Sequence, residues 1–176
     1  MPDPWEIPPI PDHGDASEDV THIARSRALD AWELLEVALS VLDARFAKAV
    51  GSRTKYGSGQ IFQKRLDILE RNANKYFIKY PDQNNESDFD ILVCHIRRYS
   101  YRRHDIAHGV VQPLGHTNIM GIDFGLLPAV YTIDRERNPF PEYIYNAEII
   151  TTFTDKFSEF WKRVTDFGYQ LFPSAP

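Results

Sequence analysis

The amino-acid sequence predicts an all-α fold, an up-and-down bundle of about four principal helices with a small β-rich hairpin insertion before the last helix. Two observations predict this fold. Apolar residues recur at intervals of three and four along four stretches of the chain, which is the spacing of an amphipathic helix. Glycines, prolines and β-branched residues gather instead between residues 113 and 146, where short strands are the better prediction.

The overall composition is that of one soluble domain. A length of 176 residues fits one domain, and the hydrophobic content of 43% and charged content of 26% are ordinary for a globular protein. Cys94 is the only cysteine, so no intrachain disulfide can form. No run approaches the roughly 18 apolar residues of a membrane span, and the N-terminus lacks the features of a signal peptide. We therefore expect a cytoplasmic protein that makes no membrane contact.

The chain divides into an N-terminal arm and the bundle. Residues 1–16 are rich in proline and acidic side chains and show no periodicity, so we expect an extended or disordered arm. The bundle then occupies residues 17–172. Its first helix is capped by Ser17 and ends near Gly51, a residue type that commonly terminates helices.

The next two helices are separated by a polar loop. Apolar residues from Phe62 to Tyr80 predict the second helix, which stops at Pro81. A loop at residues 82–85 follows. Ser87 with Asp90 resembles a capping box, which predicts a third helix from about Asp88 to Gly109 or Val111.

The segment between the third and the last helix carries the predicted strands. The stretches 127–134 and 142–145 are expected to pair as a hairpin within the insertion at residues 113–146. Asn146 then caps a final amphipathic helix that continues to about Leu171.

The third helix holds the segment richest in chemistry. At about 100° per residue, one sector gathers the predicted core residues Phe89, Leu92, Val93, Ile96, Tyr99, Ile106, Ala107 and Val110. A roughly opposite sector gathers Arg97, Tyr101, His104 and His108. Arg103 falls in the middle of the apolar sector, where a guanidinium is costly unless it is paired. Two interpretations remain open for Arg103, a buried structural ion pair and a functional group.

The two histidines on the polar sector admit two kinds of chemistry. His104 and His108 stand four residues apart, so their rings can approach each other. A metal site needs further ligands, and only Asp105 lies nearby, so no metal or other cofactor is expected. Histidine is also the side chain best suited to move protons near neutral pH. We therefore favour acid–base chemistry.

The string Arg103-His104-Asp105-Ile106-Ala107-His108-Gly109 resembles the R-x(4–6)-H signature of HEPN domains. Its position late in the third helix, before a closing amphipathic helix, agrees with that family. The resemblance implies a homodimer in which both chains line one cleft that cuts single-stranded RNA. It also implies that Arg103 and His108 form the catalytic pair and that His104 takes the polar third position.

The chemistry of such a site is reasonable from first principles. A histidine can take the proton of a ribose 2′-hydroxyl, an arginine can hold the phosphate, and the product then carries a 2′,3′-cyclic phosphate. We expect Arg97, Arg102 and Tyr101 to bind the RNA. The implied role is toxin-like or defence-like, with an antitoxin or another protein as a partner.

A non-catalytic function remains the alternative. The net charge of −5 argues mildly against bulk binding of nucleic acid, which depends on neutralising phosphates. Domains that resemble this family also serve as helical dimerisation modules or as nucleotide-binding or RNA-binding modules without activity. RNA cleavage in the presence of EDTA separates the two interpretations.

Overall fold

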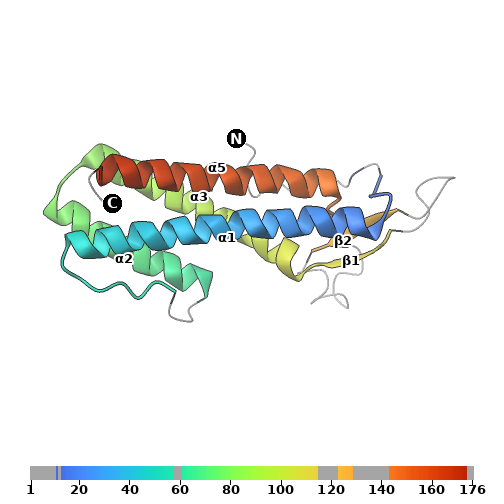
Figure 1. The fold of residues 1–176 in the computed structure, drawn as a ribbon, viewed down its shortest axis with the longest axis horizontal. Helices are drawn as coiled ribbons and strands as arrows, with labels where there is room; N and C mark the ends of the chain where they lie inside the picture. Colours follow the sequence, from blue (N-terminus) through green and yellow to red (C-terminus); the bar gives the residue numbers. More distant parts are fainter. Residues whose placement is uncertain (1–10, 12, 58–60, 115–122, 129–142, 174–176) are drawn as a thin grey trace. The chain divides into compact units, whose positions relative to one another are not determined.

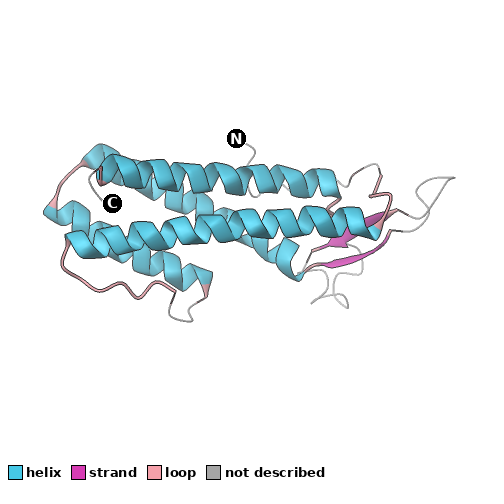
Figure 2. Cartoon of the chain, viewed as in Figure 1, coloured by secondary structure: helices cyan, strands magenta, loops and turns pink. Residues whose placement is uncertain are grey.

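A computed structural model describes residues 11, 13–57, 61–114, 123–128 and 143–173. Four helices make up 74% of these residues, and a small antiparallel hairpin precedes the last helix, so the predicted all-α bundle is confirmed (Figures 1 and 2). None of the helices described has the length and apolar character needed to cross a membrane. The elements are α1 (Glu18–Ala49), α2 (Phe62–Lys79), α3 (Gln83–His108), β1 (Val110–Pro113), β2 (Phe124–Leu127) and α5 (Ala147–Leu171).

The chain forms two compact units. The hairpin unit consists of residues 1–32 and 98–157, and the helical unit consists of residues 33–97 and 158–176. Three helices, α1, α3 and α5, contribute residues to both units, whereas α2 belongs only to the helical unit and the strands belong only to the hairpin unit.

The helical unit has an aromatic core. Phe46 is fully buried, and its ring makes edge-on contacts at centroid distances of 5.2 to 6.0 Å. The rings around it are Tyr76, Phe77, Phe89 and Phe172. Aromatic pairs of this geometry add to the stability that burial of their area supplies.

The turn after α1 is held by a buried carboxylate. Gly51 has a φ of 70°, a left-handed conformation that glycine adopts without strain. The last residue of α1 is Ala49, so the helix ends near Gly51 as predicted. Asp43 is fully buried and accepts hydrogen bonds from the Thr54 hydroxyl and, at 2.8 Å, from the Asn72 amide. The carboxylate thereby ties the loop after α1 to α2.

The hairpin unit is built on the pairing of β1 with β2, in which Val110 lies opposite Leu127. Two further segments join this hairpin through isolated bridges, Asp15 with Phe124 and Leu126 with Tyr145. The core of the hairpin unit contains Trp32, whose ring lies edge-on to that of Phe157 with 4.9 Å between the ring centroids. The strands therefore link parts of the chain that are far apart in sequence.

Asp15 also fastens the start of the last helix. Its carboxylate oxygens accept hydrogen bonds from the Ala147 backbone at 2.9 and 3.0 Å and from the Thr21 hydroxyl at 2.6 Å. Asn146 accepts a bond of 3.0 Å from the Ile149 backbone, so the predicted cap is confirmed. The predicted arm at residues 1–16 thus has contacts at its end, while residues 1–10 and 12 lie outside the described part of the chain.

The prediction for the start of the third helix was wrong. α3 begins at Gln83 rather than near Asp88, because Asp82, not Ser87, caps it. The Asp82 carboxylate accepts a 3.2 Å hydrogen bond from the backbone of Asn85, which satisfies one of the donors left unpaired at a helix start. The predicted polar loop is therefore the first turn of the helix.

The predictions for the insertion were also partly wrong. The third helix ends at His108, and Val110 is 48% exposed in β1 rather than part of the helical core face. The paired strands run from residue 110 to 127, earlier than the predicted hairpin at 127–134 and 142–145. Most of that predicted hairpin lies outside the described residues, but Tyr145 does bridge to Leu126.

Candidate functional site

The last turns of α3, within the hairpin unit, bring the signature residues to two different surfaces of the helix. Arg102, Asp105 and Ile106 are buried, whereas His104 and His108 are exposed. The buried side is covered by the segment that contains Tyr143 and Tyr145, as their contacts show. The exposed side carries the two histidines.

The buried side is a small hydrogen-bonded network around a carboxylate. The hydroxyls of Tyr143 and Tyr145 donate to the same oxygen of Asp105, at 3.0 and 3.1 Å. Arg102 donates to the Tyr145 hydroxyl at 3.1 Å and lies 3.6 Å from the Asp105 carboxylate. Its guanidinium also lies over the Tyr143 ring, 5.1 Å from the centroid. These contacts compensate the burial of two opposite charges.

Burial governs the protonation of this network. It raises the pKa of Tyr143 to about 12 and raises that of Tyr145 further above its usual range, so both phenols keep their protons and act as donors. Burial also raises the pKa of Asp105, although the two phenols and Arg102 oppose that rise. The network is therefore a stable element that fixes the turn between the two histidines.

The exposed side presents two imidazoles in contact. The rings of His104 and His108 lie 4.6 Å apart between centroids, with an angle of 50° between their planes. Partial burial lowers the pKa of His108, and His104, Arg103 and Arg25 lower it further. His108 is therefore largely neutral at pH 7 and able to accept a proton.

Arg25 reaches this site from α1. Its guanidinium donates a hydrogen bond of 2.5 Å to the backbone oxygen of Ala107, next to His108. Arg25, Tyr143 and Tyr145 were not among the predicted site residues, because their proximity to α3 comes from other elements of the fold. Nothing in the spacing of these three residues marks them.

Gly109 allows the chain to leave the helix beside the histidines. A Cβ at this position would lie 2.4 Å from the Leu127 oxygen and 2.6 Å from the Asp105 oxygen, and both are backbone atoms. Such approaches are too close for any side chain. The residue after His108 must therefore be glycine if β1 is to pair with β2 directly after α3.

The structure corrects which of the neighbouring arginines, Arg102 or Arg103, is buried. Arg102 is 6% exposed, whereas Arg103, predicted at the centre of the apolar sector, is only half-buried. The buried face of α3 turns toward Arg102 and Asp105 at this end because the Tyr143–Tyr145 segment packs there. The interpretation as a buried ion pair thus applies to Arg102.

The other predicted residues lie apart from one another. Tyr101 is 54% exposed in the hairpin unit. Arg97 belongs to the helical unit, where it donates to Gln63 at 2.8 Å, to Asp67 at 3.0 Å and to Glu70 at 2.7 Å. Of the predicted residues, the structure therefore brings together His104 and His108, with Arg103 near enough for its charge to act on His108.

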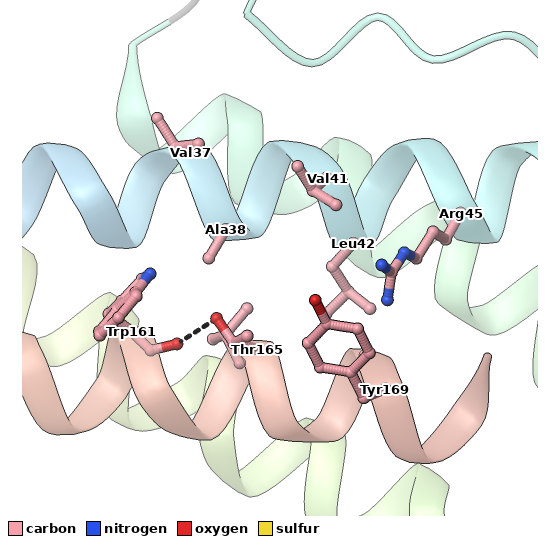
Figure 3. Close-up of a pocket in the computed structure, with 10 residues that line it drawn as sticks. Val37, Ala38, Val41, Leu42, Arg45, Trp161, Thr165 and Tyr169 are labelled. Atoms are coloured by element: carbon pink, nitrogen blue, oxygen red, sulfur yellow. Dashed lines mark hydrogen bonds between the residues drawn. The ribbon is translucent and has the colours of Figure 1, made fainter. Parts of the chain in front are cut away.

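The described part of the chain contains no group of three His, Cys, Asp or Glu side chains arranged to hold a metal ion. A separate hollow of about 210 Å³ lies on the helical unit, between α1 and α5 (Figure 3). Ala38 and Leu42 of α1 point toward α5, which carries Trp161 and Tyr169. Arg45 lies 5.1 Å from the centre of the Tyr169 ring. None of the signature residues lines it.

Comparison of the chain with protein-family models, with curated proteins and with solved structures found no match in any of the three.

Proposed function

We propose that this protein is a metal-independent endoribonuclease that cuts single-stranded RNA and has a toxin-like or defence-like role. One observation carries the proposal, the exposed contact between His104 and His108 at the end of α3. Two imidazoles beside the cationic side chains of Arg103 and Arg25 form a site suited to a phosphodiester, because the cations attract phosphate and the imidazoles transfer protons.

The proposed reaction begins with proton removal by His108. Neutral His108 takes the proton of a ribose 2′-hydroxyl, and the 2′-oxygen forms a bond to phosphorus. The bond from phosphorus to the 5′-oxygen then breaks, and that oxygen leaves with a proton from a second imidazole. The products are a 2′,3′-cyclic phosphate and a 5′-hydroxyl. Arg103 binds the phosphate as its charge develops, and His104 orients His108 and the phosphate.

The geometry of displacement supports a second copy of the chain in the site. The attacking and leaving oxygens lie on opposite sides of phosphorus, so the base and the acid must approach from opposite sides. Rings only 4.6 Å apart reach the phosphate from one side. In the proposal, His108 of a second copy therefore supplies the acid, and the exposed Tyr101 lies near the two-fold axis.

The observed contacts refine the proposed roles of two arginines. Arg102 contacts Tyr145 and Asp105 in the interior. In the proposal it therefore stabilises the buried side of α3 beneath the site and does not touch RNA. Arg97 is already engaged with Asp67 and Glu70. Its predicted role in RNA binding requires it to exchange these partners for phosphate.

The second candidate function is a non-catalytic helical module for dimerisation or for binding a nucleotide or RNA. The same observation on Arg97 and Arg102 favours it, because two of the predicted RNA-binding cations are neutralised within the chain. A module of this kind needs the exposed surface of α3 but no proton transfer at His108.

A cleavage assay separates the two functions. We would incubate the purified protein with a labelled, unstructured RNA in EDTA and identify the new ends. We expect cuts that leave a 2′,3′-cyclic phosphate, and their loss in His108→Ala. A wild-type protein that binds RNA but never cuts it, with His108→Ala binding equally well, would establish the non-catalytic module instead.

A further inference from the structure

One face of α1 carries exposed apolar residues in a regular order. Val20, Ile23, Leu34 and Val37 are 43%, 53%, 53% and 61% exposed, although most large aliphatic side chains of this helix that face the core are fully buried. Between the two apolar pairs lie Arg27 and Asp30, both exposed. We call these residues the α1 seam: Val20, Ile23, Arg27, Asp30, Leu34 and Val37.

The spacing of the α1 seam is that of a helix that packs against another helix. Its members alternate at intervals of three and four residues, which are the a and d positions of a heptad repeat. The buried residues of α1, among them Ala24, Ala28 and Leu35, lie on a different face. A second apolar stripe on a helix already packed against the core indicates a partner, because solvent-facing helix surfaces are normally polar.

The charges in the middle of the seam select the partner and its direction. Among the described residues, neither Arg27 nor Asp30 takes part in an ion pair. In an antiparallel pair of identical helices, a positions face d positions of the other chain. The register that places Arg27 opposite Asp30 also places Ile23 opposite Leu34 and Val20 opposite Val37. Every contact then occurs twice, as two-fold symmetry requires.

Other arrangements of two α1 seams place like charges together or charged side chains against apolar ones. A parallel pair sets Arg27 against Arg27 and Asp30 against Asp30, which places like charges together. An antiparallel pair shifted by one heptad toward the C-terminus sets Arg27 against Val37 and Asp30 against Leu34. A shift in the other direction sets Ile23 against Arg27. Only the first register pairs apolar with apolar and positive with negative throughout.

We infer that two copies of this chain associate through an antiparallel contact between their α1 seams, with the two-fold axis between Arg27 and Asp30. The seam from Val20 to Val37 spans about 26 Å at 1.5 Å per residue, and packed helix axes lie about 8–10 Å apart. A single helix pair is small beside interfaces of about 1,200–2,000 Å², so we expect a dissociation constant of about micromolar order. The contact uses no residue of the proposed RNA site. It is a second interface, separate from the α3 contact proposed for that site, so chains that make both contacts assemble beyond a dimer.

Charge reversal tests whether the α1 seam contacts a second copy of the same chain. In sedimentation experiments over a concentration series, we expect Arg27→Asp and Asp30→Arg each to weaken association by about tenfold or more, because each places like charges together twice. A mixture of the two variants restores both ion pairs and should associate like the wild type. The double variant Arg27→Asp with Asp30→Arg should do so as well.

The matched control is Arg71→Asp, which makes the same change on an exposed residue of α2. It should leave association unchanged. RNA cleavage by Arg27→Asp should equal that of the wild type. The sedimentation result does not depend on whether the protein cuts RNA, so failure of the proposed function would leave it unchanged. Wild-type association by both single variants, or a mixture no better than either alone, would overturn the inference.

Cross-linking tests the direction. With Cys94→Ser as the background, Ile23→Cys mixed with Leu34→Cys should form a disulfide between chains. Ile23→Cys alone should not, because its two copies lie about 16 Å apart along the antiparallel pair, well beyond the reach of a disulfide. A parallel pair gives the opposite result, with rapid cross-linking of Ile23→Cys to itself, and would refute the proposed contact.

Discussion

The Arg25 guanidinium of α1 donates a 2.5 Å hydrogen bond to the backbone oxygen of Ala107 on α3, one residue before His108. The last carbonyl groups of a helix have no partner within it, and the helix dipole makes that end negative. A cation from α1 therefore satisfies the end of α3 at the point where the two imidazoles stand. The structural role of Arg25 and its effect on the His108 pKa are two results of one contact.

Loss of His108 should remove activity without removing the fold. We expect His108→Ala to lower kcat by about 10²–10⁴-fold, the usual contribution of general acid–base catalysis. Because the side chain is exposed, the thermal midpoint should stay within about 2 °C of the wild type. Gel-based cleavage rates and calorimetry measure the two effects. His22→Ala, which removes a histidine from α1, should change neither, and equal activity of His108→Ala and the wild type would contradict the mechanism.

The pKa of His108 should respond to the cations around it. Burial, His104, Arg103 and Arg25 lower this pKa, so removal of a cation must raise it toward the ordinary value of about 6.5. NMR titration of the ring protons should show that rise in Arg103→Ala. In the wild type, the acidic limb of the pH–rate profile should lie below pH 6.5, and in Arg103→Ala it should move to higher pH. Unchanged titration in the variant would exclude the proposed influence of Arg103.

A depressed His108 pKa also predicts how stability changes with pH. Below about pH 6.5 the unfolded chain binds a proton at this position more readily than the folded chain does. As the pH falls from that value to the lower pKa of the folded state, proton uptake by the unfolded chain therefore progressively lowers the free energy of unfolding. Urea unfolding at a series of pH values should show a smaller acid loss in His108→Ala than in the wild type. An identical loss in both proteins would contradict the assigned shift.

Removal of the Tyr145 hydroxyl should measurably destabilise the folded protein. In Tyr145→Phe, Arg102 loses a hydrogen-bond acceptor and Asp105 loses a donor, both in the interior. We expect the free energy of unfolding to fall by about 1–3 kcal/mol, the typical cost of unsatisfied buried polar groups. Denaturant titration measures this value. Tyr169→Phe, on an exposed side chain, should have no measurable effect, and a similar result for Tyr145→Phe would show that the network is not needed.

Gly109 and Gly51 should differ in their tolerance of alanine. In Gly109→Ala the new Cβ meets two backbone oxygens at 2.4 and 2.6 Å, so we expect a loss of more than about 2 kcal/mol or a displaced hairpin. Gly51 has a φ of 70° with open space around it, so Gly51→Ala should cost only about 1 kcal/mol for its strained backbone. Comparable losses in the two variants would contradict the close approach at Gly109.

Periodicity predicted the helices, and local chemistry alone could not predict what packs against them. The bounds of α1 and the Asn146 cap follow from spacing and from a capping residue, both local properties. The burial of Arg102 in place of Arg103 depends on Tyr145, which lies 43 residues later in the chain and reaches α3 through the fold. No helical wheel contains that information. The His104–His108 contact was predictable because it lies within one turn of one helix.

The start of α3 was predicted too late because two residues compete to cap this helix. Asp82 and Ser87 are both good capping residues, and the choice between them depends on which turn the helix gains by starting earlier. The Asn85 side chain adds a 2.6 Å bond to the other oxygen of Asp82, which favours the earlier start. Competition between two adequate caps is decided by such additional contacts.

The bonds of Asp15 have a consequence for biosynthesis. This carboxylate holds the first residue of α5, 132 positions later in the chain, and its backbone pairs with Phe124. The ribosome synthesises Asp15 long before either partner, so Asp15 lacks both contacts until residue 147 has been made. Closing so long a loop is slow, because its entropy is spent before any contact forms. The hairpin unit can therefore be completed only after the start of α5 has left the ribosome.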